Sequence, residues 1–266
     1  MIEAIERRYA RAEDGTRIHY RVEGPEDGVP LLLSHSLGVT LDTWAPQVAA
    51  LADRFRVVRY DARGHGGSDA PEGIYEIGEL ARDALAVLDA EGIAQAHLLG
   101  LSMGGMVGMW IATHAPRRIG RLVLANTTPH IPLRDMWNSR IETALGEGMA
   151  PIAAPTIGRW LGEAFKARDP EAVEQIVARM RGMSPVGYAG CCAALREADQ
   201  RETISRIAAP TLVITGSADL ATTPALAESI AAAIRGARAE VIPDAGHLSN
   251  VEQPEAFNRI VRSFLV

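Results

Sequence analysis

Short apolar runs alternate with longer amphipathic segments through most of this 266-residue chain. We interpret seven runs as strands, at residues 17–22, 31–33, 55–60, 96–101, 122–125, 212–215 and 240–242, and the intervening segments, such as 77–91, 103–114, 225–234 and 255–264, as helices. Several strands are continuously apolar, as strands covered on both faces of a parallel sheet must be. The alternation predicts an α/β fold with a mostly parallel sheet and helices on both faces.

Residues 130–206 interrupt this alternation. They hold helical patterns, at 135–145 and 171–181 for instance, and prolines 151, 155, 170 and 185 mark the joints between them. The segment has no convincing strand pattern. The simplest interpretation is a helical cap (lid) over residues 130–206, inserted in a core domain that consists of residues 1–129 and 207–266.

Charge and apolar content exclude several classes of protein. Lys and Arg total 27 against 33 Asp and Glu, and the formal net charge is −6. A mildly acidic chain without a basic run is poorly suited to bind nucleic acid or an anionic membrane surface. No run approaches the roughly 20 apolar residues of a membrane span, and residues 1–10 lack the apolar stretch of a signal peptide. We expect a cytoplasmic protein that is a monomer or a small homo-oligomer.

A serine stands between two glycines in the sequence GLSMG at residues 100–104, where a strand meets a helix. A tight turn at such a junction holds a nucleophile with strained backbone angles, and only small neighbours leave room for it. The helix N-terminus behind the serine stabilises negative charge that develops during attack. The alternative is a glycine-rich turn that only packs the helix against the strand. The flanking strand and helix favour Ser102 as a nucleophile.

A serine hydroxyl becomes nucleophilic when a neighbouring base takes its proton. In folds of this kind the acid and then the histidine follow the serine, each on a loop after a later strand. Asp219 and His247 occupy such loops. Among the competing residues, His65 and Asp61 precede the serine in the chain, His35 flanks another motif, and Asp244 lies close to His247 in sequence. Structural hydrogen bonding is expected for the other histidines: His19, His97, His114 and His130. We predict a catalytic triad of Ser102, Asp219 and His247.

The negative charge on the attacked carbonyl oxygen requires hydrogen-bond donors. One donor is the backbone N–H of Met103, directly after the serine, and the second is expected from the loop at residues 34–38, through the N–H of Leu37. The alternative for this loop is a plain turn between a strand and a helix. This chemistry requires no metal and no organic cofactor.

Four segments resemble the α/β-hydrolase superfamily and, within it, the 3-oxoadipate enol-lactonases of the β-ketoadipate pathway: SHSLG at 34–38, YDARGHGGSDAPEG at 60–73, GLSMGGM at 100–106 and AGHLSN at 245–250. GLSMGG alone is shared with esterases, lipases and cofactor-free haloperoxidases. The combination of HSLG with LDTW at 41–44 and GHGGSDAPEG is what points to the enol-lactonases among these families. The similarity covers nearly the whole chain and is weakest in 130–206. It implies the α/β-hydrolase fold, whose mostly parallel sheet has eight strands. By motif, the family's triad falls on Ser102, Asp219 and His247, and its oxyanion donors fall on Leu37 and Met103. Leu220 departs from the family, which often has proline after the acid.

The resemblance implies a small anionic substrate, a five-membered enol-lactone with an acetate arm, which water opens to 3-oxoadipate through an acyl-enzyme in bacterial catabolism of aromatic compounds. Its carboxylate requires a cation or converging N–H donors in a mostly apolar pocket. Arg134, Arg140 and Arg159 are candidate cations within 130–206, and Trp137 and Trp160 are candidate apolar walls. The alternative for each is a solvated charge or a core aromatic residue.

Other functions fit the same triad. A short-chain carboxylesterase would act on neutral esters, and a cofactor-free haloperoxidase or perhydrolase would use peroxide in place of water. A ligand receptor without catalytic activity has no need of a serine, an acid and a histidine in this order. A dehalogenase is excluded because its nucleophile would be a carboxylate.

Overall fold

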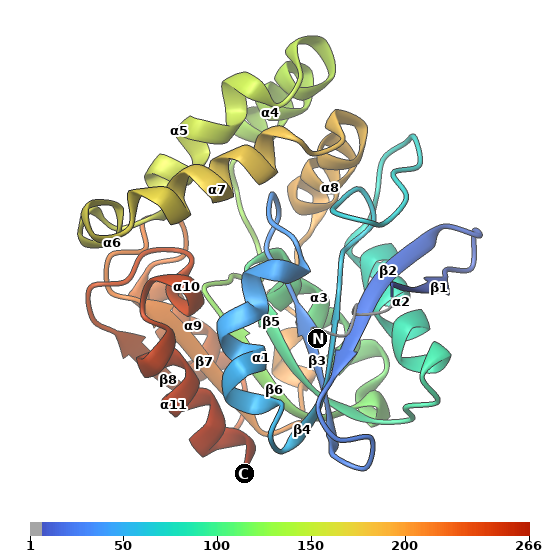
Figure 1. The fold of residues 1–266 in the computed structure, drawn as a ribbon. Coiled ribbons are helices and arrows are strands. Elements are labelled where there is room, and N and C mark those ends of the chain that lie inside the picture. Colours follow the sequence, from blue (N-terminus) through green and yellow to red (C-terminus); the bar gives the residue numbers. More distant parts are fainter. Residues whose placement is uncertain (1–6) are drawn as a thin grey trace, which may run out of the picture.

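The computed structural model describes residues 7–266 and contains one eight-stranded sheet with the order β1-β2-β4-β3-β5-β6-β7-β8 (Figure 1). β1 and β2 are antiparallel to each other, and β2 is antiparallel to β4. The remaining neighbours are parallel. The predicted mostly parallel, eight-stranded sheet is therefore confirmed. The expectation of no signal peptide rests partly on residues 1–6, which lie outside the described residues.

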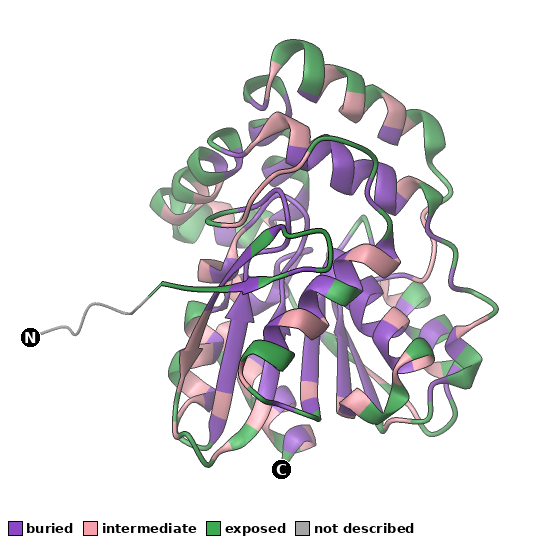
Figure 2. Ribbon diagram, turned by 90° about the vertical axis from the view of Figure 1, so that its right-hand side faces the viewer, coloured by how far each residue is buried: buried purple, intermediate pink, exposed green. Residues whose placement is uncertain are grey.

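Seven strands coincide with the predicted apolar runs, and one was not predicted. The strands are β1 (Arg8–Arg11), β2 (Arg17–Glu23), β3 (Val29–Ser34), β4 (Phe55–Tyr60), β5 (Ala96–Leu101), β6 (Ile119–Ala125), β7 (Thr211–Gly216) and β8 (Arg238–Ile242). The central strands are almost entirely buried (Figure 2). Burial on both faces explains why their sequences are continuously apolar.

Helices cover both faces of the sheet. They are η1 (Leu41–Trp44), α1 (Ala45–Leu51), α2 (Ile77–Ala90), α3 (Met103–His114), η2 (Pro116–Arg118), η3 (Ile204–Arg206), α9 (Pro224–Ala233), α10 (Ser249–Glu252) and α11 (Pro254–Leu265). On one face α1 contacts α11, and on the other α2 contacts α3 (Figure 1). Phe257, Val261 and Leu265 recur one helical turn apart in α11 and are buried, so this stripe attaches the helix to the sheet.

Five helices lie between β6 and β7 in sequence and above the carboxyl ends of the parallel strands in space (Figure 1). We call them the helical layer: α4 (Arg134–Glu147), α5 (Ala150–Trp160), α6 (Glu163–Arg168), α7 (Pro170–Arg181) and α8 (Pro185–Glu197). α4 packs on α8, and α5 packs on α7. The layer meets the core closely where a Cβ added to Gly187 would lie 2.2 Å from Gly64 Cα. Among the described residues, no helix has the length and apolar character needed to cross a membrane.

Candidate active site

Ser102 occupies the turn between β5 and α3 with φ of 53° and ψ of −111°. A side chain at Gly100 or Gly104 is excluded, because an added Cβ would lie 2.2 Å or 2.0 Å from a backbone carbonyl oxygen. The N–H of Ser102 donates to the carbonyl of Ala125 at 2.9 Å, and the hydroxyl of Thr127 donates to the carbonyl of Ser102 at 2.7 Å. These contacts hold a non-glycine residue in backbone angles that it rarely adopts.

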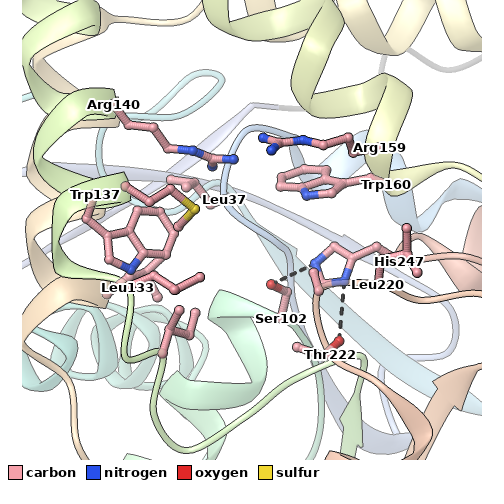
Figure 3. Close-up of a pocket in the computed structure, with 14 residues that line it drawn as sticks. Leu37, Ser102, Leu133, Trp137, Arg140, Arg159, Trp160, Leu220, Thr222 and His247 are labelled. Atoms are coloured by element: carbon pink, nitrogen blue, oxygen red, sulfur yellow. Dashed lines mark hydrogen bonds between the residues drawn. The ribbon is translucent and has the colours of Figure 1, made fainter.

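The structure brings together the three residues predicted from chain order. His247 Nε2 lies 3.0 Å from Ser102 Oγ (Figure 3), and His247 Nδ1 lies 2.9 Å from Asp219 Oδ2. Ionised Asp219 only accepts hydrogen bonds, so the proton of neutral His247 resides on Nδ1. The lone pair on Nε2 then faces the serine hydroxyl, which is the tautomer that a general base requires.

Asp219 is buried and accepts hydrogen bonds on both carboxylate oxygens. Oδ1 accepts the backbone N–H groups of Ala221 at 2.8 Å and Thr222 at 2.9 Å. Oδ2 accepts the hydroxyl of Thr222 at 2.5 Å and the amide of Asn126 at 2.8 Å, in addition to His247. Burial raises the pKa of Asp219, but the charge and hydrogen bond of His247 and the bonds from Asn126 and Thr222 hold it well below its usual range.

Asn126 was not predicted as part of the site. It directly follows β6 with φ of 45°. Its amide also donates to the carbonyl of Gly246 at 3.1 Å, and its side-chain oxygen accepts the hydroxyl of Ser249 at 2.5 Å. Asn126 thereby connects the loop of Asp219 to the loop of His247. The sequence feature that could have identified Asn126 is its position at the carboxyl end of a parallel strand, because ligand-binding loops lie at this edge of the sheet.

Leu37 and Met103 lie beside Ser102 on two different segments, the loop at residues 34–38 and the first turn of α3. Leu37 lines the cavity beside Ser102, and Met103 begins α3. Within the described part of the chain, neither backbone N–H donates to a protein acceptor. Buried N–H groups without a partner are rare, so both are suited to bind a negatively charged oxygen.

Two buried histidines hold the loop at residues 34–38. His35 Nε2 accepts the N–H of Ala62 at 3.0 Å, and its Nδ1 donates to the carbonyl of Ser36 at 2.7 Å. His65 Nε2 accepts the N–H of Gly38 at 3.0 Å, and its Nδ1 donates to a carbonyl at 3.1 Å. Each ring accepts at one nitrogen and donates at the other, so both are neutral. The loop that carries Leu37 therefore depends on two uncharged imidazoles.

Lowering the pH from 7 to 4 is expected to destabilise the protein through His65. Burial, together with the nearby His35, lowers the pKa of His65 from its ordinary value of 6.5 to about 3. As the pH falls below 6.5 the unfolded chain binds this proton and the folded chain does not, so stability present above pH 6.5 is lost. By pH 4 this loss amounts to about 3 kcal/mol of unfolding free energy.

Guanidinium unfolding followed by circular dichroism at pH 7, 5 and 4 measures this effect. His65→Gln should start less stable and lose less stability on acidification than the wild type. His114→Gln, which changes an exposed histidine, should follow the wild-type pH dependence. Equal losses in the wild type and His65→Gln would show that His65 does not govern this acid sensitivity.

A cavity of about 250 Å³ lies above Ser102, between the core and the helical layer (Figure 3). Its lining is mostly apolar and includes Trp137 and Trp160, as the sequence predicts. Arg140 and Arg159 also line it, and Figure 3 shows both side chains directed into the space above Ser102. The cavity is at the small end of the range for ligand sites, which suits a small substrate.

The two cavity arginines have no carboxylate partner among the residues that the structure describes. Arg140 donates to the hydroxyl of Tyr188 at 3.3 Å, and its guanidinium carbon lies 5.3 Å from the centre of the Trp137 ring. Arg159 is exposed at the cavity rim. Two cations without anionic partners beside an apolar wall favour binding of an anion.

Arg134 lies outside the cavity, which corrects the expectation that it belongs to the pocket. Its side chain is 62% exposed and forms an ion pair of 2.9 Å with Glu197. Positions 134 and 140 point about 120° apart around a helix of 3.6 residues per turn. Arg140 and Trp137 face the cavity, so Arg134 is turned to the outer surface.

Comparison with known proteins identifies the family. Residues 31–260 match the alpha/beta hydrolase family. The chain is 40% identical to 3-oxoadipate enol-lactonase 2 of Acinetobacter baylyi, over 93% of this chain and 92% of that protein, and 39% identical to enol-lactonase 1 of the same organism, over 94% of each. The crystal structure of the enol-lactonase from Burkholderia xenovorans superposes with a TM-score of 0.94 at 42% identity, covering 97% of this chain and 99% of that one. A hydrolase structure from Pseudomonas aeruginosa gives 0.95 at 45% identity, covering 99% of each chain. The chain therefore belongs to the alpha/beta hydrolase family, and the predicted resemblance to the 3-oxoadipate enol-lactonases is confirmed over nearly its whole length.

Proposed function

We propose that the protein is a serine hydrolase that opens 3-oxoadipate enol-lactone with water to give 3-oxoadipate, a step of the β-ketoadipate pathway. The observation that carries the proposal is a small apolar cavity with Ser102 and His247 on one side and, on the other, two arginines that have no carboxylate partner within residues 7–266. The relatives named enol-lactonases support the substrate.

In the first half of the reaction Ser102 attacks the lactone carbonyl. His247 Nε2 takes the hydroxyl proton as Ser102 Oγ bonds to the carbonyl carbon. The N–H groups of Leu37 and Met103 bind the oxyanion, and each such donor lowers the barrier by roughly 3–4 kcal/mol. The ring C–O bond then breaks with its electron pair on oxygen. The enolate takes the proton from His247 and tautomerises to the ketone.

In the second half water releases the acyl group. The former leaving group remains tethered by its carbon chain, so water must enter beside it. His247 takes a proton from water as the hydroxide oxygen bonds to the acyl carbon, and the bond to Ser102 Oγ breaks. The proton passes from His247 to Ser102 Oγ. The new carboxylic acid loses its own proton to solvent, so the product leaves as a dicarboxylate. Asp219 stabilises the imidazolium in both halves. These steps use no cofactor.

The cavity has the groups required to orient the substrate. We propose that Arg140, with Arg159 opposite, binds the carboxylate of the acetate arm, while Trp137 and Trp160 contact the ring.

We also propose that residues 130–206 act as a cap (lid) over a core domain of residues 1–129 and 207–266. Core and cap residues both line the cavity, which supports this division.

Relative activity on two substrates tests the function. The purified protein should hydrolyse the enol-lactone with a kcat/KM about 100-fold or more above that for p-nitrophenyl acetate, because one charge-assisted contact is worth about 1.5–3 kcal/mol and the tethered arm orients the carbonyl. A higher kcat/KM for the neutral ester would instead indicate a carboxylesterase. Efficient turnover that requires peroxide would indicate a perhydrolase.

Replacement of Arg140 by methionine is expected to raise KM for the anionic lactone. Loss of a charge-assisted hydrogen bond costs about 1.5–3 kcal/mol, which corresponds to roughly 10- to 100-fold. Hydrolysis of p-nitrophenyl acetate should stay within about twofold, because that ester carries no charge for Arg140 to bind. Steady-state kinetics on both substrates measure the difference. Arg134→Met, on the outer surface of the same helix, is the matched control and should leave both substrates unaffected.

A further inference from the structure

A fully buried carboxylate lies next to the catalytic histidine loop. Glu252 ends α10 and has no exposed surface. Its Oε1 accepts the N–H of Gly246 at 3.0 Å, and its Oε2 accepts the N–H of Gly162 at 2.8 Å. In the described part of the chain no cationic side chain pairs with the carboxylate. Burial raises its pKa, and the charge of Asp219 adds to the rise. A buried carboxylate is costly unless the hydrogen bonds it accepts compensate.

The two N–H groups come from different parts of the fold. Gly246 immediately precedes His247, and Gly162 follows the end of α5 in the helical layer. The same two segments are also joined directly, because the N–H of His247 donates to the carbonyl of Trp160 at 2.7 Å. A Cβ on Gly246 would lie 2.3 Å from that carbonyl oxygen. The histidine loop therefore packs directly against the helical layer.

Two further contacts extend this junction to the reaction site. Arg168 of α6 donates to the backbone carbonyl of Glu252 at 2.6 Å. The ring centre of Trp160 lies 5.1 Å from that of His247. Trp160 and His247 both line the cavity (Figure 3). Trp160, which lines the cavity, and His247, the general base, therefore lie in the two backbone segments that the carboxylate of Glu252 joins.

We propose that Glu252 is a positioning residue whose carboxylate joins Gly162 to Gly246 and thereby holds His247 in line with Ser102. The proposal rests on the proposed serine-hydrolase function, since it concerns the imidazole used in that reaction. An ionised carboxylate offers an acceptor at both oxygens, whereas a glutamine offers one acceptor and one donor. With glutamine, one of the two backbone N–H groups would face the amide NH₂ and lose its partner.

Two substitutions break this junction from opposite sides. Glu252→Gln removes one acceptor. Gly162→Pro removes the N–H of the helical layer, at a position whose φ of −67° matches that of proline. The matched control is Glu255→Gln, which makes the same chemical change at an exposed residue. Gly162→Pro also provides a second route if Glu252→Gln does not fold.

Two readouts report the alignment of His247 with Ser102. One is kcat and KM for p-nitrophenyl acetate, and the other is the rate at which diisopropyl fluorophosphate labels Ser102, followed by mass spectrometry. Small displacements of reacting groups cost large factors in rate, so kcat and the labelling rate should fall about tenfold in Glu252→Gln and Gly162→Pro. KM should stay within about threefold of the wild-type value, and kcat and the labelling rate of Glu255→Gln should stay within about twofold of wild type.

Unchanged kcat and labelling rates in folded Glu252→Gln and Gly162→Pro, with only a lower melting temperature, would overturn the proposal and leave Glu252 a purely structural role. A rise in KM alone would also overturn it, because Glu252 would then order the substrate pocket and not the imidazole. Both readouts are independent of the lactone. If the wild type hydrolyses no enol-lactone, the proposed substrate fails while these measurements still decide the role of Glu252.

Discussion

Replacement of Ser102 by alanine is expected to lower kcat for lactone hydrolysis by about 10⁴- to 10⁶-fold. Alanine removes the hydroxyl that lies 3.0 Å from His247 Nε2, so no acyl-enzyme forms. The residual rate comes from the oxyanion donors and from substrate binding. The fold should persist, because alanine and serine experience similar strain at φ of 53°. Stopped-flow or steady-state assays with enough enzyme to detect slow turnover measure the loss.

Ser217→Ala is the matched control for this substitution. Ser217 lies on the loop after β7, and its hydroxyl accepts the N–H of Asp244 at 2.9 Å, away from the reacting atoms. Its kcat should stay within about twofold of the wild type. Thermal unfolding should show that Ser102→Ala is folded. Retention of more than about one hundredth of kcat in folded Ser102→Ala would contradict a covalent serine mechanism.

The sheet was largely predictable because its strands carry an unambiguous signal. β4 and β5 match the predicted runs residue for residue, since both strands are mostly buried and rich in apolar residues. β1 was missed for the opposite reason. This edge strand has the sequence RYAR and only Ala10 is buried, so hydrophobicity does not mark it. Its pairing with β2 is visible only in three dimensions.

The candidate catalytic residues were predictable because strand order brings their loops to one edge of the sheet. Ser102, Asp219 and His247 each follow a parallel strand, so their positions along the chain imply their meeting. The same reasoning could not place Arg134 and Glu252. The rotation of α4 decides that Arg134 faces solvent, and tertiary packing decides that Glu252 is buried beside the histidine loop. Residue type favours exposure for both, because most arginines and glutamates are exposed, so it gave no sign that Glu252 is buried.

Asp244 is the comparison that tests the assignment of the acid. Asp244 stands closer to His247 in sequence than Asp219 does, yet it is exposed, with φ of 54°. Asparagine tolerates this region of backbone space, so Asp244→Asn should preserve the fold. It should also keep kcat within about twofold, since its carboxylate has no contact with the imidazole. A large loss in this variant would contradict Asp219 as the catalytic acid.

Replacement of Asp219 by asparagine is expected to lower kcat by about 10⁴-fold. The carboxylate now accepts from His247 Nδ1, so the Nε2 lone pair faces Ser102. An asparagine NH₂ group turned toward the ring would donate to Nδ1, move the imidazole proton to Nε2 and leave no base for the serine proton. Because the pKa of Asp219 lies well below its usual range, the aspartate is ionised throughout the pH range in which a histidine titrates. The deficit should therefore persist from pH 6 to pH 9, and kcat measured across that range checks it.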